Sequence, residues 1–222
     1  ISFIILLWVF AAGIFYLCLQ SIDLGQAWNE LSKANPSWLF LGIFLNACIL
    51  GLWSTLWYLL LPKNLSISFV RVFQANSFMS TSCNTIPFPG GHAVGVMALA
   101  RRTKVGHTVA LSVLALDQLM EGFAKIFVLT LVAIFVPLPE LMGQAILVFI
   151  AAIGFFASIM FYFAHKKPEE REGQEAVSVT GKVRAFVSRW STHLEVLRDI
   201  RIFSLGLMLA LLMMFTQTLG IW

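Results

Sequence analysis

The sequence predicts an all-α, polytopic helical membrane protein, and three observations support this prediction. Of the 222 residues, 59% are hydrophobic and 12% are charged, whereas soluble globular domains carry roughly 25% charged residues. Several apolar runs reach the length of about 20 residues that a transmembrane helix requires. Between two of these runs lies a polar segment, residues 66–104, that proline and glycine interrupt. We therefore expect one transmembrane domain over residues 1–222, with about five to six transmembrane helices plus a re-entrant broken-helix hairpin.

Five apolar runs supply the expected spans, and a short helix follows the first of them. Leu24, Ala27, Trp28 and Leu31 have helical spacing, and Ser21 or Asp23 can cap this segment. Tryptophan side chains collect at membrane–water interfaces, so this helix is expected to lie at the interface. The chain does not begin with Met and ends inside an apolar run, so we expect a fragment of a longer chain. The five runs are residues 1–19, 37–61, 106–136, 141–164 and 200–222.

The segment 66–104 is expected to enter and leave the membrane on one side. Its first half carries too many polar side chains to face lipid. Its second helix, residues 93–102, rises only ~15 Å, about half of a ~30 Å hydrocarbon core. Non-helical backbone at membrane depth survives where protein or a water-filled cavity satisfies its polar groups. A re-entrant hairpin meets both conditions.

The distribution of basic residues supports the hairpin and sets the orientation. With a re-entrant hairpin, 13 of the 15 Lys and Arg residues fall in loops on one side, and the positive-inside rule places that side in the cytoplasm. The cytoplasmic loop 165–199 carries apolar residues along one face of a helix and basic residues on the others, which predicts a helix lying on the membrane surface. A full crossing by residues 66–87 is the alternative, and it would place this basic loop outside.

Other classes of protein receive no support from the sequence. The net charge of +4 reflects the basic loops, so we expect no nucleic-acid partner. Cys18, Cys48 and Cys83 are far apart and form no metal-binding pattern, so we expect inert buried thiols, no metal site and no cofactor. The common catalytic motifs of hydrolases, zinc proteases and nucleotide-binding enzymes are missing. We therefore expect a protein that is not an enzyme.

Three charged residues form a stripe on the span 106–136. Asp117, Glu121 and Lys125 are spaced by four residues, which places them on one helix face. Asp117 lies ~16 Å along the helix from its cytoplasmic start, near the bilayer middle, where a charge costs ~3 kcal/mol. Such residues are functional candidates. In the structural alternative, Glu121 pairs with Lys125, and Asp117 pairs with Arg71 or the broken backbone.

The break at residues 87–91 supplies a second candidate. A helix that starts near His92 directs free N–H groups into the membrane, and such groups bind anions such as a lipid phosphate. Arg101 and Arg102 at the far end of this helix suit anionic headgroups at the cytoplasmic surface. The alternatives are a plain kink, close helix packing through Gly91 and Gly95, and basic residues that only set the topology.

The stretch Asn84–Gly122 resembles the signature region of the lysylphosphatidylglycerol synthase/flippase transmembrane family. The matching residues are Pro89-Gly90-Gly91, Arg101-Arg102, Gly106, Ala110, Asp117 and Glu121-Gly122. The resemblance implies lipid-headgroup binding and translocation in the bacterial cytoplasmic (inner) membrane, with an anionic phospholipid as partner. The residues expected to bind the headgroup are Asn84, Pro89, Gly90, Gly91, His92, Arg101, Arg102, Asp117, Glu121 and Lys125.

The chain also departs from the family pattern. The family usually has Gly-Glu and then Arg soon after the break, where this chain has His92-Ala93 and then Val94-Gly95. Asp117-Gln118 stands where a Glu-Arg pair is usual. These lost charges favour an alternative function, an accessory or structural subunit of a larger bacterial membrane complex, with protein partners or a homo-oligomer.

Overall fold

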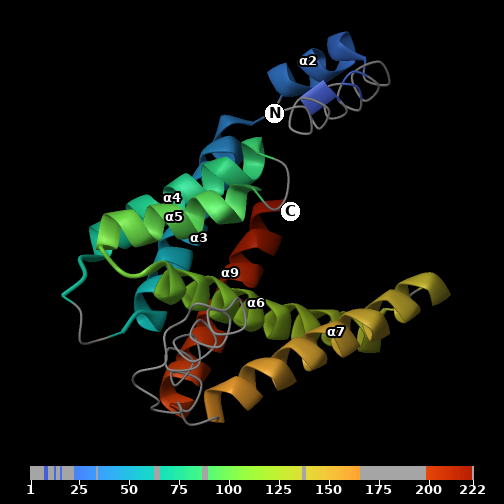
Figure 1. The fold of residues 1–222 in the computed structure, drawn as a ribbon. Coiled ribbons are helices and arrows are strands. Elements are labelled where there is room, and N and C mark those ends of the chain that lie inside the picture. The colour runs from blue at the N-terminus through green and yellow to red at the C-terminus, as the bar shows by residue number, and fades with distance from the viewer. Residues whose placement is uncertain are drawn as a thin grey trace, which may run out of the picture. The chain divides into compact units, whose positions relative to one another are not determined.

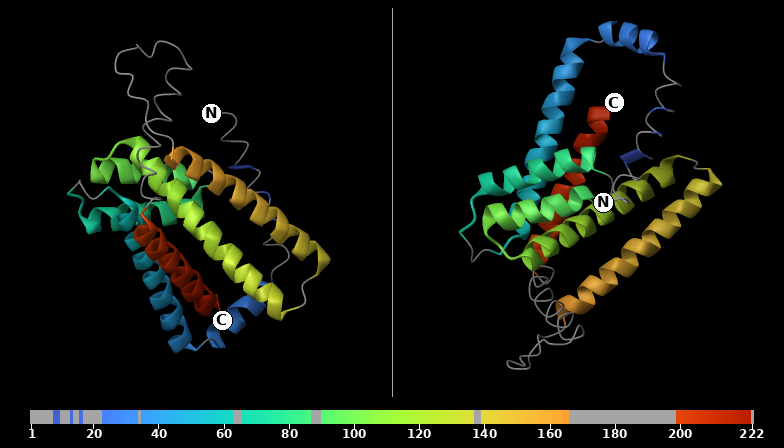
Figure 2. Two further views of the ribbon diagram at one scale, coloured as in Figure 1. Left: turned by 90° about the horizontal axis from the view of Figure 1, so that it is seen from below. Right: turned by 45° about the horizontal axis from the view of Figure 1, so that its top comes forward.

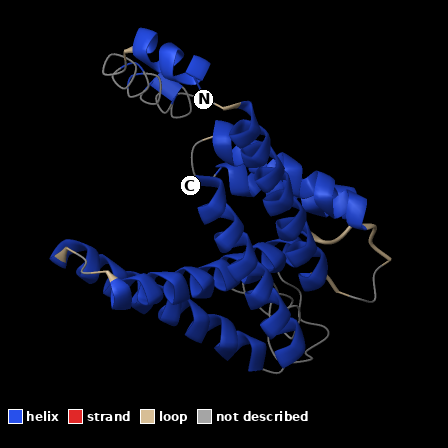
Figure 3. Cartoon of the chain, turned by 180° about the vertical axis from the view of Figure 1, so that it is seen from behind, coloured by secondary structure: helices blue, strands red, loops and turns tan. Residues whose placement is uncertain are grey.

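The computed structural model describes most of the chain as helix. The described residues are 23–33, 35–62, 66–86, 90–136, 139–165 and 199–221, with Trp8, Val9, Gly13 and Tyr16 near the N-terminus. All regular structure in these ranges is helical (Figures 1 and 3), which confirms the all-α class. The first expected span, residues 1–19, lies almost entirely outside the described residues. Of the loop 165–199 with its expected surface helix, only the two end residues are described.

The chain divides into two compact units, residues 1–44 and residues 45–222. The first contains α2 (Leu24–Lys33), whose start is capped as expected. Oδ1 of Asp23 accepts hydrogen bonds from the N–H groups of Gly25 at 2.9 Å and Gln26 at 3.1 Å, and these groups otherwise lack partners at a helix start. The expected single domain over the whole chain stays a prediction.

Four helices are long and apolar enough to cross a bilayer, and they match four of the five expected spans. The first begins in the first unit and continues into the second. Large apolar side chains remain exposed along these helices, as lipid-facing surfaces require. The described chain is therefore that of a multi-pass membrane protein. The four helices are α3 (Pro36–Leu60), α6 (His107–Phe135), α7 (Glu140–His165) and α9 (Ile200–Ile221).

The polar segment folds into two short helices that pack side by side, α4 (Phe69–Thr85) and α5 (Gly90–Thr103), as Figures 1 and 2 show. They are antiparallel, because Gly91 lies against Cys83 while Gly95, one turn later, lies against Met79 one turn earlier. At 1.5 Å per residue each helix is shorter than ~30 Å, so neither spans a hydrocarbon core alone. The helical hairpin is confirmed, and its re-entry into the membrane stays a prediction.

Glycine makes the approach of α4 and α5 possible. A Cβ on Gly91 would lie 2.5 Å from the Cα and 2.6 Å from the backbone N of Cys83. The alternative interpretation, in which Gly91 and Gly95 allow close packing of two helices, is therefore confirmed. Packing against Gly91 does not cover the thiol, however, since the Cys83 residue is exposed and Cys48 is only half-buried. The expectation of buried cysteines is wrong for Cys83.

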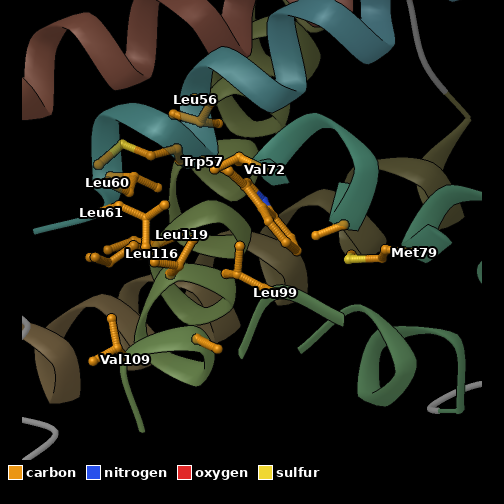
Figure 4. Close-up of a cluster of buried hydrophobic side chains, with 14 of the residues drawn as sticks. Leu56, Trp57, Leu60, Leu61, Val72, Met79, Leu99, Val109, Leu116 and Leu119 are labelled. Atoms are coloured by element: carbon orange, nitrogen blue, oxygen red, sulfur yellow. The ribbon is translucent and has the colours of Figure 1, made fainter. Parts of the chain in front are cut away.

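The core of the second unit forms around α6, which packs against α5, α7 and α9. Trp57 of α3 is fully buried there, next to side chains from α4, α5 and α6 (Figure 4). The largest fully buried side chains are Leu56, Trp57, Leu60, Val72, Met79, Leu99, Val113, Leu116, Leu119, Met120 and Met160. Packing in this core fixes the rotation of α3 and α6 and their positions along the helix axes, and so places the polar residues that they carry.

Replacing Gly91 by Ala is expected to destabilise the fold by about 1–3 kcal/mol, because the new methyl group meets backbone atoms that cannot move aside. Gly95→Ala is expected to cost less, since its methyl group meets the flexible Met79 side chain. Denaturant titration in mixed micelles measures both. Gly154→Ala is the control, because nothing lies within 4 Å of its Cβ position; equal effects at Gly91 and Gly154 would contradict the packing assignment.

The re-entrant hairpin predicts that the basic end of α5 and the loop after α7 lie on one side of the membrane. Cysteines introduced at Arg101 and Thr180, after removal of the native cysteines, are expected to react with a membrane-impermeant maleimide from the same side. Reaction from opposite sides would show that α4 and α5 complete a crossing.

Candidate functional site

The structure places the predicted site residues in three separate groups. Asn84, Gly90, Gly91 and His92 lie at the turn between α4 and α5. Arg101 and Arg102 lie at the opposite end of α5, ~17 Å away along the helix at 1.5 Å per residue. Asp117, Glu121 and Lys125 lie along α6. Pro89 is outside the described residues.

The turn group presents the start of α5. Helix α5 begins at Gly90, two to three residues earlier than expected, and the first N–H groups of a helix have no intrahelical acceptor. Gly91 is buried against Cys83, and Nδ1 of His92 lies 3.8 Å from the Cys83 Sγ. Asn84 is exposed and donates to the carbonyl of Ser80 at 3.0 Å. One side of the helix start is therefore closed by α4.

The basic group contains one arginine that the fold holds in place. Nη1 of Arg102 donates to Oε1 of Gln74 at 2.6 Å, and its guanidinium lies 4.7 Å from the centre of the Phe78 ring. Both partners belong to α4, so Arg102 links the two helices of the hairpin through a hydrogen bond and a cation–π contact. Arg101 and Lys104 are exposed, and Lys104 has a positive φ of 59° at the turn into α6.

Asp117 is fully buried between α6 and α3. Its Oδ1 accepts a hydrogen bond from Nε1 of Trp53 at 3.0 Å, and its Oδ2 has a longer contact of 3.5 Å with Nε2 of Gln118. Within the described residues, no Lys, Arg or His side chain forms an ion pair with it. The expected pairing of Asp117 with Arg71 is therefore wrong, because Trp53 of α3 supplies the hydrogen-bond partner instead. Residues 87–89 of the broken backbone lie outside the described residues.

Further polar atoms lie buried on the same part of α3. The rings of Trp53 and Trp57 meet edge to face, with centroids 6.2 Å apart. Nδ2 of Asn76 donates to Oγ of Ser54 at 3.3 Å. Among the described residues, Nε1 of Trp57 lies near the Asp117 carboxylate without hydrogen-bond geometry, and Oδ1 of Asn76 is buried with no partner. Both atoms can therefore still form a hydrogen bond. Leaving a buried polar atom unsatisfied costs about 1–3 kcal/mol.

These α3 and α4 residues were missing from the predicted site. Trp53 and Trp57 are four residues apart in an apolar helix, and Ser54 lies on the same part of it. The spacing shows that the two rings share a helix face, but it does not show which helix they meet. The signal was available as two indole N–H groups within a span, since buried Trp N–H groups usually find an acceptor.

Glu121 and Lys125 form an ion pair, as the structural alternative predicts. The Nζ of Lys125 lies 2.8 Å from Oε2 of Glu121. The pair follows from its i, i+4 spacing with the acid on the N-terminal side, which is the favoured order on a helix. Asp117 is thus the member of the stripe that has no opposite charge beside it in the described part of the chain.

The α3–α6 hydrogen bond is expected to hold the site together. Trp53→Phe removes the N–H donor and is expected to lower the free energy of unfolding by about 1.5–3 kcal/mol, as for other hydrogen bonds to charged groups. Combining it with Asp117→Leu in a double-mutant cycle should give a coupling energy well above zero. Trp38→Phe, at an exposed position of α3, is the control and should show none.

Comparison with known proteins identifies the family. A sequence model described as "Lysylphosphatidylglycerol synthase TM region" matches residues 2–222, which extends the resemblance of the stretch 84–122 to nearly the whole chain. No curated protein matches the chain significantly, and no solved structure does. The chain therefore belongs to the lysylphosphatidylglycerol synthase transmembrane-region family.

Proposed function

We propose that the protein binds the headgroup of a phospholipid or lipid-linked molecule and carries it across the bilayer, in the manner of a flippase. Membership of a lipid-related membrane family supports a role in lipid handling. The observation that carries the proposal is the Asp117 carboxylate, which is fully buried within a membrane span and has no ion-pair partner among the described residues. We place the protein in the bacterial cytoplasmic membrane.

The hydrogen bond from Trp53 offsets part or all of the cost of burying Asp117 in a membrane helix. A charged residue at the centre of a membrane helix costs ~3 kcal/mol on insertion scales. One good hydrogen bond, from Trp53 at 3.0 Å, returns about 1.5–3 kcal/mol when it involves a charged group. Replacement by an apolar residue would avoid the cost, so retention of the acid at this depth fits a residue that interacts with a polar ligand.

The rest of the proposed site supplies the anion-binding part. The helix start at Gly90 and His92 has N–H groups that suit a lipid phosphate, and exposed Arg101 suits anionic headgroups at the membrane surface. In this proposal the lipid is bound and moved without forming or breaking covalent bonds. Neither a cofactor nor an enzymatic step is part of the proposed mechanism.

A second candidate function is an accessory or structural subunit of a larger bacterial membrane complex. Several residues first assigned to headgroup binding have partners inside the fold. Arg102 contacts Gln74 and Phe78, Gly91 packs on Cys83, and Lys125 pairs with Glu121. These contacts favour a scaffold in which the family's charged positions serve packing. Recovery of a fixed complex from the native membrane, with lipid content unaffected by changes at Asp117, would support this function.

Asp117→Asn is expected to reduce lipid translocation in proteoliposomes at least about tenfold, which corresponds to 1.4 kcal/mol. The amide keeps a hydrogen-bond acceptor for Trp53, so the fold should remain intact. Translocation of fluorescent phospholipids, followed by quenching from the outside, measures the effect.

The matched control is Asp199→Asn, because Asp199 is exposed at the start of α9, where its side chain accepts from the N–H of Arg201 at 3.0 Å. Asparagine serves this capping position equally well, so translocation should not change. Full activity of Asp117→Asn, with unfolding like that of the unaltered protein, would remove Asp117 from the transport mechanism.

A further inference from the structure

The ion pair on α6 lies at the middle of a membrane span, yet it is not buried. Glu121 is the central residue of α6 (His107–Phe135), which puts it about 20 Å from either end at 1.5 Å per residue. The side chains of Lys125 and Glu121 are 45% and 21% exposed, respectively. An ion pair that is both deep in a membrane span and partly exposed is unexpected, because charged side chains at this depth usually face the protein interior or a water-filled cavity.

Exposed charges at this depth cannot face hydrocarbon at low cost. A Lys or acidic side chain at the centre of a membrane helix is costly to insert. Pairing within 2.8 Å offsets part of that cost, but the exposed N–H groups of Lys125 still need acceptors that lipid chains lack. Lys125 lies ten residues, ~15 Å, before the end of α6 at Phe135. Helical side chains tilt toward the N-terminus of their helix, so the Lys125 ammonium is directed away from that end.

The opposite face of α6 differs in kind. Phe127 lies two residues after Lys125, a rotation of about 200° around the helix at 100° per residue, and it is apolar and 57% exposed. That face suits lipid. Gln118 lies three residues before Glu121 and therefore shares its face, and it is half-buried. Near the middle of α6, polar side chains are thus gathered on one edge and an apolar side chain is exposed on the other. Leu111 and Val132, which are also exposed on the polar edge, lie nearer the two helix ends.

We infer that the edge of α6 that carries Gln118, Glu121 and Lys125 faces water at mid-membrane depth. Buried Asp117 lies beside this edge, one turn before Glu121 on the same stripe of α6. The inference rests on the proposed function in one respect, since a wet edge beside Asp117 supplies the polar route that a headgroup needs through the bilayer. Water is the occupant, and a headgroup in transit replaces it.

Thiol accessibility tests this directly. In a cysteine-free background, Lys125→Cys and Phe127→Cys are compared in lipid nanodiscs with a charged, membrane-impermeant methanethiosulfonate. Reaction requires the thiolate, whose formation in hydrocarbon costs about 3 kcal/mol, or about 100-fold in rate. Lys125→Cys is therefore expected to react about 100-fold faster than Phe127→Cys, at a depth that differs by only ~3 Å.

A second probe covers the loss of the ion pair in Lys125→Cys. Gln118→Cys leaves Glu121 and Lys125 unchanged and is expected to react at a rate close to that of Lys125→Cys. If both probes on this edge react as slowly as Phe127→Cys, the edge is covered by lipid or protein and the inference is wrong. Fast reaction of all three, including Phe127→Cys, would overturn it as well, because α6 would then have no lipid-facing side.

The thiol-accessibility result and the translocation result for Asp117→Asn can fail independently of each other. Reactive probes together with unchanged translocation by Asp117→Asn would leave the wet edge established and the transport role of Asp117 refuted. Unreactive probes together with loss of translocation in Asp117→Asn would overturn the wet edge and leave the proposed function standing.

Discussion

The hydrogen bond from Trp53 to Asp117 is the interaction on which the rest of this structure depends. Its donor Nε1 and acceptor Oδ1 lie 3.0 Å apart and join α3 to α6. Among the described residues, Asp117 is the only fully buried carboxylate. Coulomb and hydrogen-bond energies grow as the local dielectric falls. A single well-placed donor therefore constrains the rotation of both helices more strongly than it would in water. Trp57 packs edge to face on Trp53 and extends this constraint into the apolar core.

The hairpin of α4 and α5 is held by a different kind of contact. Small residues let the two backbones approach, with Gly91 against Cys83 and Gly95 against Met79, and Arg102 links the far ends of the helices through Gln74 and Phe78. Close packing of this kind replaces the hydrophobic effect as the source of helix association inside a membrane. The hairpin can thus stay together although it carries many polar side chains and each helix is too short to span.

The candidate site combines residues with unlike roles. Glu121 and Lys125 neutralise each other, Arg102 contacts α4, and the buried carboxyl group of Asp117 accepts a hydrogen bond from Trp53. The buried Oδ1 of Asn76, which has no partner within the described ranges, adds unused hydrogen-bonding capacity nearby. In a low-dielectric setting these differences decide which groups remain available to a ligand, because an already paired charge gains little from a new partner.

The sequence by itself determined the membrane class, four of the spans, the helical hairpin and the Glu121–Lys125 pair. Each depends on local information: apolar length, the positions of Pro and Gly, and i, i+4 spacing. The partner of Asp117 was decided only by the tertiary structure. Spacing along α6 places this carboxylate on a face, but the helix that covers the face follows from how side chains of α3, α4, α5 and α6 pack together. Packing between distant segments therefore set Trp53, rather than Arg71, beside the acid.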